Sequence, residues 1–244
     1  MVDNGSEGDD AQVLKKRFAD CIHLIENDRN YGFAGGANIG MRYALNNYSP
    51  EYLLLLNNDT VVAPGFLNQL IKLAESDASI GIVGPKVYKY NSANCIDSIG
   101  ARLNMWTGQV DFLAYTHIDT GQYDDQLEVD WVGPCILMKS GMVQNIGLYD
   151  ESYFFYWEDV DYCIRAKKAG YKVMFLPEAK IWHKRGKSSE KMASGSLDYY
   201  STRNRIRFMK KHASRCQYLT FLVYLFGWHL FNSAPAILFR ISVN

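Results

Sequence analysis

The chain has 244 residues, of which 48% are hydrophobic, so it can bury the core of one large domain or of a domain with an appendage. Its formal net charge is +0, which gives no global field for nucleic acid and excludes that partner from our expectations. The five cysteines are scattered, odd in number and without a C-x-x-C pair. We therefore expect reduced thiols in a cytoplasmic protein, and neither a disulfide framework nor a zinc site.

The first 50 residues predict two strand ends, a short helix and a glycine-rich turn. Residues 1–6 are typical of a strand that runs into a turn, residues 12–18 of a helix and residues 21–25 of a strand. A glycine-rich turn then leads into a helix over residues 38–47, whose N-terminus would favour negative charge. The stretch lacks the G-x-G-x-x-G pattern, and a tight strand-to-helix turn explains it equally well.

Residues 52–59 are the part of the chain around which we expect the rest to be organised. Leu53 to Leu56 predict a short central strand that is buried on both faces, and Asn57-Asn58-Asp59 follow at its carboxyl end. Ligands bind at that edge of open α/β sheets, and a carboxylate there suits a divalent cation. The alternative is that Asp59 only caps the next helix, in whose first turn we place Pro64.

The middle of the chain predicts a change from alternating strands and helices to antiparallel β-structure. The elements expected, in chain order, are a helix over residues 65–75, a strand over 80–88, an irregular hairpin over 91–108, strands over 109–115 and 128–132, a strand over 135–138, and a short helix that Ser140 caps and that ends near residue 146.

Residues 154–165 combine aromatic side chains with carboxylates. Helical spacing predicts a helix whose N-terminus carries Glu158 and Asp159, while Asp161 and Arg165 pair on its surface. Aromatic rings beside two carboxylates suit a sugar site with a general base. The alternative is an ordinary acidic helix start with buried aromatic residues.

His183 follows a strand predicted over residues 171–176 and precedes the basic loop from Lys184 to Lys187. A histidine in this position can ligate a metal, and a basic loop can fold over phosphates. A packed histidine beside a solvated loop is the alternative.

The C-terminal region predicts a basic helix over residues 199–212 and then an apolar stretch over residues 219–239. That stretch is near the length of a membrane span, but Gly227, His229, Asn232, Ser233 and Pro235 interrupt it. We expect first a helix pair on a membrane surface, then packing onto the domain, and last a true span.

Taken together, these motifs resemble those of inverting glycosyltransferases of family 2, in particular the bacterial rhamnosyltransferase-like branch. The motifs that match, in chain order, are Val2-Asp3-Asn4-Gly5-Ser6, residues 30–40, Asn57-Asn58-Asp59, Gly133, Gly147-Leu148-Tyr149-Asp150, Glu158-Asp159-Val160-Asp161, His183 and residues 199–204. The resemblance implies an α/β fold of the GT-A type, with a Rossmann-like mixed sheet flanked by helices over residues 1–212. Residues 213–244 would form a helical, apolar appendage.

The resemblance also implies a role for each matching residue. Asp159 corresponds to the catalytic base and Glu158 to a residue that orients the acceptor, while Asp59 and His183 correspond to metal contacts. The residues that correspond to the donor-binding site are Asp3, Asn38, Asn57, Asn58, Gly133 and Lys187. Asn57 occupies a position where many relatives have Asp, which removes one charge near the metal.

The activity that this resemblance implies is transfer of a sugar, with inversion, from dTDP-rhamnose or a UDP-sugar to a glycan or lipid-linked acceptor. Mg²⁺ or Mn²⁺ would assist, and the protein would lie in the cytoplasm, at the inner face of the membrane. The alternatives are a non-catalytic sugar-nucleotide binder and a nucleotidyltransferase. A nucleotidyltransferase would need a lysine-bearing glycine-rich loop near the N-terminus, and the sequence has none.

Relatives begin with a strand and a helix upstream of the segment that matches Val2 to Ser6. From this difference we expect strands that lack a hydrogen-bonding partner, and self-association through the incomplete sheet.

Overall fold

The structure is a computed structural model, and it describes residues 1–18, 21–92, 94–184 and 196–227. The described residues form a seven-stranded sheet and two smaller two-stranded sheets. The main path of the large sheet runs β3 (Tyr52–Leu56), β10 (Cys135–Lys139), β5 (Ile80–Lys89), β11 (Lys172–His183) and β4 (Thr60–Val62), while β6 (Ile96–Ser98) pairs with β5 and β9 (Leu127–Glu128) with β11. Only β5 and β11 are parallel within this sheet, so the sheet is mixed.

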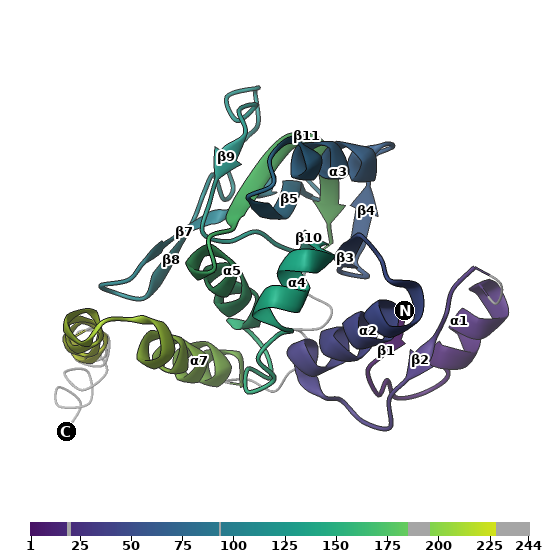
Figure 1. The fold of residues 1–244 in the computed structure, drawn as a ribbon, viewed down its shortest axis with the longest axis horizontal. Coiled ribbons are helices and arrows are strands. Elements are labelled where there is room, and N and C mark those ends of the chain that lie inside the picture. Colours follow the sequence, from purple (N-terminus) through teal and green to yellow (C-terminus); the bar gives the residue numbers. More distant parts are fainter. Residues whose placement is uncertain (19–20, 93, 185–195, 228–244) are drawn as a thin grey trace, which may run out of the picture.

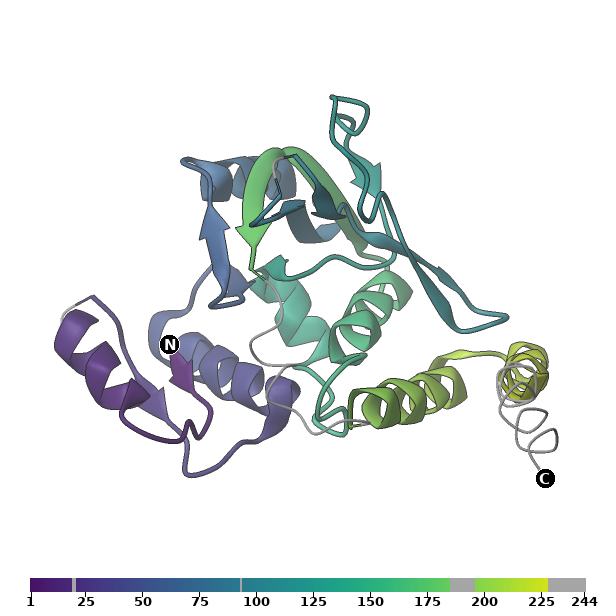
Figure 2. The ribbon, with the colours of Figure 1, turned by 180° about the vertical axis from the view of Figure 1, so that it is seen from behind.

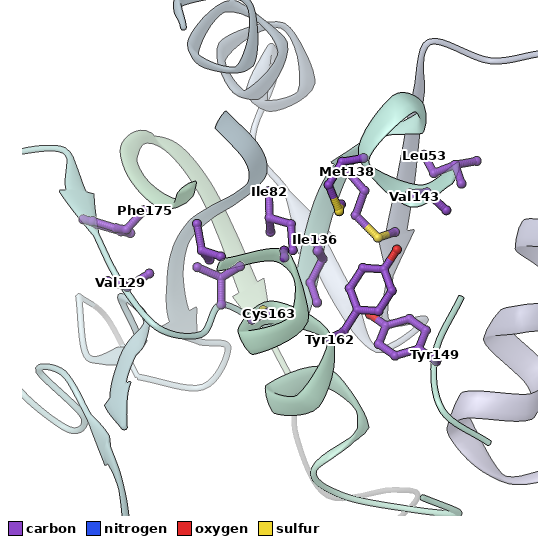
Figure 3. Close-up of a cluster of buried hydrophobic side chains, with 14 of the residues drawn as sticks. Leu53, Ile82, Val129, Ile136, Met138, Val143, Tyr149, Tyr162, Cys163 and Phe175 are labelled. Carbon is purple, nitrogen blue, oxygen red and sulfur yellow. The ribbon is translucent and has the colours of Figure 1, made fainter. Parts of the chain in front are cut away.

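Helices cover both faces of the seven-stranded sheet (Figure 1). Helix α3 (Phe66–Ser76) packs on one face with Val83, and α2 (Gly32–Tyr48), α4 (Ser140–Ile146) and α5 (Glu158–Lys168) share the other face with Ile82. Successive residues of β5 thus enter opposite cores, as the two-residue period of a strand requires. Figure 3 shows the core between the sheet and helices α2, α4 and α5, in which the ring centroids of Tyr149 and Tyr162 lie 4.5 Å apart. The predicted mixed sheet with flanking helices is confirmed.

Strand β3 occupies one end of the sheet, and the prediction of a central, doubly buried strand is wrong. Among the described residues β3 pairs only with β10. Its leucines do contact both cores, but Leu53 is buried while Leu56 is 38% exposed. The strand after it was also not expected: Thr60–Val62 form β4, and Pro64 lies outside α3, which starts at Phe66.

Helix α2 confirms the helix predicted over residues 38–47, but it begins at Gly32, so the glycine-rich turn predicted directly before residue 38 is wrong. Gly32 starts the helix with φ of 76°, and a Cβ there would lie 2.3 Å from the carbonyl oxygen of Phe154. Further along, Cβ atoms on Gly36 and Gly40 would lie 3.0 Å from the side chains of Asn4 and Val2. The glycines therefore let neighbouring chain segments approach the helix closely.

A separate parallel pair, β1 (Val2–Asp3) and β2 (Ile25–Glu26), packs beside α2 with α1 (Asp10–Phe18) next to it. The prediction of a helix over residues 12–18 is confirmed. Of the strand expected over residues 21–25, only Ile25 lies in a strand, as the first residue of β2. Figures 1 and 2 show this unit at one end of the molecule, opposite α7 (Ser196–His212). The second small sheet is the hairpin of β7 (Ala101–Asn104) and β8 (Gln109–Phe112).

Helix α7 confirms the basic helix predicted near residues 199–212, and residues 215–227 are helical as well. Phe208 and Phe221 from these helices are buried with Trp157 in one apolar cluster. Within the described part of the chain, no helix combines the length and apolar character needed to cross a bilayer. The apolar stretch predicted to reach residue 239 lies outside the described residues from residue 228 onward.

Asp161 is fully buried, so the prediction of a surface ion pair with Arg165 is wrong in its location. The pair exists, with Arg165 Nε 2.9 Å from Asp161 Oδ2. The Nε2 atom of His212 lies 2.7 Å from the other carboxylate oxygen, and Lys211 Nζ lies 2.8 Å away. Burial opposes ionisation, but the hydrogen bonds from His212 and Lys211 outweigh it and lower the pKa of Asp161. Asp161 therefore joins α5 to α7.

Candidate active site

Two strands bring Asp59 and His183 together. Thr60 pairs with His183 in the β4–β11 ladder, so the residue before β4 lies next to the end of β11. The backbone N–H of Lys184 donates to the carbonyl oxygen of Asp59 at 2.9 Å, which closes this end of the ladder. The Nε2 atom of His183 lies 3.1 Å from Asp59 Oδ1. Asp59 is therefore held beside a histidine and does not cap a helix.

Asp97 on β6 is the third side chain at this point. The Nδ1 atom of His183 lies 3.1 Å from Asp97 Oδ2, and Asp97 is 1% exposed. The imidazole thus lies between two carboxylates, which fixes the ring orientation. Sequence reasoning missed Asp97, because nothing around residues 96–98 distinguishes it from any other polar residue of a hairpin.

The donor atoms present here fit a divalent cation that completes its shell from elsewhere. Asp59 offers a carboxylate oxygen and His183 an imidazole nitrogen, and both side chains are partly exposed. Among the described residues, no group of three or more His, Cys, Asp and Glu side chains could hold a metal by itself. Mg²⁺ in nucleotide sites commonly has one or two protein ligands and takes the others from phosphates and water.

Gly133 lies beside Asn57 at the same end of the sheet. The backbone N–H of Asn57 donates to the carbonyl oxygen of Pro134 at 3.2 Å, and the peptide bond between Gly133 and Pro134 is cis. Asn58 is exposed, and Gly133 is buried against the ring of Trp131, where a Cβ would lie 2.7 Å from that ring. The segment from Trp131 to Pro134 thus begins beside α5 and ends beside residues 57–59.

The carboxylates of Glu158 and Asp159 lie at the N-terminus of α5, as predicted. Glu158 is 5% exposed, and its Oε2 atom has no hydrogen-bond partner among the described residues. Asp159 is partly exposed, and its Oδ1 accepts a hydrogen bond of 2.8 Å from the backbone N–H of Val160. Glu158 is therefore enclosed by protein, while the neighbouring residue Asp159 is partly exposed.

Burial governs the ionisation of both carboxyl groups. It raises the pKa of Glu158 well above its ordinary value, and the charge of Asp159 adds to the shift. Burial also raises the pKa of Asp159, while Trp131 and the N–H of Val160 act in the opposite direction. Ionisation is therefore disfavoured more strongly at Glu158 than at Asp159, so Asp159 is the carboxyl group of the pair that ionises first as the pH rises.

The remaining predicted donor-site residues lie in different surroundings. Asp3, at the end of β1, accepts a hydrogen bond of 3.2 Å from the N–H of Ser6. Asn38 is 1% exposed, and its amide bonds to the backbone of Tyr149 and to Glu151, so it holds the 149–151 loop, while its expected donor contact stays a prediction. Lys187 lies outside the described residues.

Asn4 has a larger structural role than the sequence indicated. Its side-chain oxygen accepts hydrogen bonds from the Asn27 side chain and the Tyr31 N–H, and its amide donates to Asn30 and to the carbonyl oxygen of Gly32. These bonds join the end of β1 to the start of α2. The one signal in the sequence is the matching motif of residues 2–6, which names the segment but not this residue.

Relatives of the chain are known glycosyltransferases. It is 24% identical to the low-salt glycan biosynthesis hexosyltransferase Agl10 of Haloferax volcanii, over 93% of this chain and 73% of that protein. It is also 24% identical to N-acetylglucosaminyl-diphospho-decaprenol L-rhamnosyltransferase of Mycobacterium tuberculosis, over 87% of this chain and 75% of that protein.

Solved glycosyltransferases share the fold. The mannosyltransferase PcManGT of Pyrobaculum calidifontis, in complex with GDP-Man and Mn²⁺, matches with a TM-score of 0.59 and 15% identity, over 100% of this chain and 65% of that one. GalNAc-T7 with UDP, GalNAc and Mn²⁺ matches with a TM-score of 0.57 and 17% identity, but over 75% of this chain and only 36% of that one. The chain therefore spans less than two thirds of these structures and has their GT-A fold. The model of the glycosyltransferase-like family 2 matches residues 1–197, and the chain belongs to that family.

Proposed function

We propose that this protein transfers a sugar, with inversion, from a nucleoside-diphosphate donor such as dTDP-rhamnose or a UDP-sugar to a glycan or lipid-linked acceptor. The observation that carries the proposal is the contact between Asp59 and His183 at the end of the seven-stranded sheet. Helix α5, which packs on this sheet, presents Asp159 at its N-terminus. This arrangement supplies one place for a charged leaving group and another for a base.

Asp159 is the base in this mechanism. It ionises more readily than Glu158, is partly exposed and has a raised pKa, so its carboxylate accepts the proton of an acceptor hydroxyl more readily than that of an ordinary aspartate. The hydroxyl oxygen attacks the anomeric carbon as the bond to the diphosphate breaks, and the configuration inverts. Burial and the neighbouring Asp159 favour the protonated form of Glu158, to which the family resemblance assigns the orientation of the acceptor.

Asp59 and His183 are the residues that would hold Mg²⁺ or Mn²⁺ together with the donor diphosphate. Such a cation would supply positive charge to the departing nucleoside diphosphate. Asn57, Asn58 and Gly133 line the same end of the sheet and serve donor binding, while Asp3 reads the base from β1. The family resemblance also assigns Lys187, which lies outside the described residues, to donor binding.

The helix of residues 215–227 suggests where the acceptor is presented. Leu219, Leu222, Val223 and Phe226 follow helical spacing and are 63%, 37%, 74% and 69% exposed, so they form an apolar face without a protein cover among the described residues. The exposed basic side chains of residues 196–227 are Arg207, Lys210, Lys211 and Arg215, and the one acidic side chain of this range is Asp198. Positive charge beside an apolar face suits an anionic membrane surface. The decaprenol in the name of the mycobacterial relative supports an acceptor held there.

The exposed edge of β3 supports a second partner, another copy of the chain. Among the described residues β3 is paired on one side only, and Leu56 on it is 38% exposed. An unpaired strand edge with apolar side chains is a template for pairing with another chain.

A thermal-shift screen of nucleoside diphosphates and their sugars, with and without Mn²⁺, tests this function. Metal-dependent stabilisation by one nucleotide class is the expected result, because only a ligand of the native state raises the melting temperature. Stabilisation by a donor that this chain then neither transfers nor hydrolyses would favour the non-catalytic binder. Stabilisation by no nucleotide would contradict both functions.

A further inference from the structure

The two residues before the catalytic carboxylates have an uncommon backbone conformation. Tyr156 has φ of 67° and Trp157 has φ of 76°, and Trp157 directly precedes Glu158. Bulky residues in the left-handed region are strained, and such strain persists only where the surroundings determine it. Something outside the loop must therefore hold this turn.

Asn204 on α7 supplies that restraint. It is 0% exposed, and its Nδ2 donates to the carbonyl oxygens of Phe155 and Tyr156, both at 2.8 Å. Its Oδ1 accepts a hydrogen bond of 2.9 Å from Arg203 Nε. Both amide hydrogens of one side chain are thus used on two consecutive carbonyls of the turn.

Helix α7 holds the side chain of the turn as well as its backbone. The ring of Trp157 lies 5.1 Å from that of Phe208, which is four residues after Asn204 and hence on the same face of α7. Arg203 Nη2 donates to the carbonyl oxygen of Ser152 at 3.3 Å, at the other end of the loop. The helix therefore contacts residues 152–157 at their start, in their strained turn and at their last ring.

We propose that Asn204 is a positioning residue, which fixes the N-terminus of α5 and so sets where Glu158 and Asp159 meet the acceptor. Without the amide, two partly buried carbonyl groups lose their donor, and the turn relaxes toward negative φ. A displacement of about 1 Å at a reacting group can cost about 10²-fold in rate. The effect on turnover rests on the function proposed above, whereas the restraint on the turn does not.

The test compares Asn204→Ala and Asn204→Asp with Arg205→Gln. Arg205 is the next residue of α7, and its Nη2 donates to the carbonyl oxygen of Thr107 at 2.6 Å, so its loss loosens the same helix at a different anchor. Hydrogen–deuterium exchange with mass spectrometry reports backbone opening in the peptides that cover residues 152–160, and those of β5 and β10 report the rest of the fold. Calorimetry with dTDP or UDP and Mn²⁺ reports donor binding, and transfer assays report kcat and KM.

We expect faster exchange over residues 152–160 in both Asn204 variants, unchanged exchange in β5 and β10, retained nucleotide binding, and a kcat lowered by about 10²-fold. Arg205→Gln should leave exchange over residues 152–160 and kcat close to those of the wild type. Wild-type exchange over residues 152–160 in Asn204→Ala would overturn the proposal, as would equal opening of β5 and β10. If the wild type transfers no sugar, the proposed function fails, and the exchange comparison still decides the role of Asn204.

Discussion

The Nε2 atom of His183 lies 3.1 Å from Oδ1 of Asp59, although His183 ends β11 and Asp59 directly precedes β4, far earlier in the chain. The β4–β11 ladder enforces this contact, because Thr60 pairs with His183 itself. The contact joins the predicted metal carboxylate to the predicted histidine, and among the described residues no third His, Cys, Asp or Glu completes a metal-binding group with them.

Removing the carboxylate of Asp59 should weaken metal-dependent nucleotide binding by at least about tenfold, because charged oxygen ligands dominate the affinity for Mg²⁺ and Mn²⁺. His183→Ala should weaken it less, since a neutral imidazole contributes no charge. Isothermal titration calorimetry with UDP or dTDP, with and without Mn²⁺, measures both effects. Unchanged metal dependence in Asp59→Ala would leave Asp59 with a structural role only.

Much of the fold could be predicted because its signals are local. The amphipathic period of α3, the apolar run of β10 and the basic helix α7 are each visible in their own residues. The glycine-rich stretch misled us, because low helix propensity indicates a turn, whereas packing of β1 and the Phe154 loop against Gly32, Gly36 and Gly40 makes it a helix.

The candidate site was predictable as a set of motifs but not as a geometry. Asp59 and His183 were identified from their places after strands, and the structure puts them in contact. Asn38 was assigned to the donor, but its amide is used by Tyr149 and Glu151, residues far along the chain. Asp97 carries no local signal, because its importance comes only from the ring that it contacts.

Substituting Glu158 by Gln should reduce the pH dependence of stability. The pKa of Glu158 is raised in the folded state, so its stabilising contribution is full below the unfolded pKa of about 4.3 and is lost as the pH rises through the folded pKa. Glu158→Gln stays neutral in both states and avoids that loss. Urea unfolding at pH 5 and pH 8 should show a smaller decrease between these values for the variant than for the wild type. Equal decreases would mean that Glu158 ionises normally in the folded protein.

The double substitution of Val223 and Phe226 by Ser should weaken binding to anionic lipid vesicles by about tenfold or more, since each buried apolar side chain contributes roughly 1.5–3 kcal/mol. Co-sedimentation with vesicles that contain an anionic phospholipid measures this. The matched control is Val13→Ser on α1, which is equally apolar and 50% exposed. If the control loses as much binding as the double variant, or if the wild type does not bind, the helix of residues 215–227 is no membrane contact.

Self-association through β3 should depend on concentration and on the charge of its edge. Size-exclusion chromatography with light scattering should show dimers or larger species that increase with concentration, and Leu56→Lys should shift them to monomer, because edge lysines oppose strand pairing. Leu67→Lys is the control, since Leu67 is 37% exposed on α3, away from that edge. A wild type that stays monomeric over the whole range would remove this partner.

The most direct test of the account is turnover of a nucleotide sugar by the wild type and by Asp159→Asn. Release of nucleoside diphosphate from dTDP-rhamnose or UDP-sugars, followed with and without Mn²⁺ and with a lipid-linked or glycan acceptor, gives the rate. We expect Mn²⁺-dependent release by the wild type, and a rate about 10²–10⁴-fold lower in Asp159→Asn with nucleotide binding retained, because the variant lacks only the base. Near-normal turnover in Asp159→Asn, or no metal-dependent release by the wild type from any of these donors, would contradict the account.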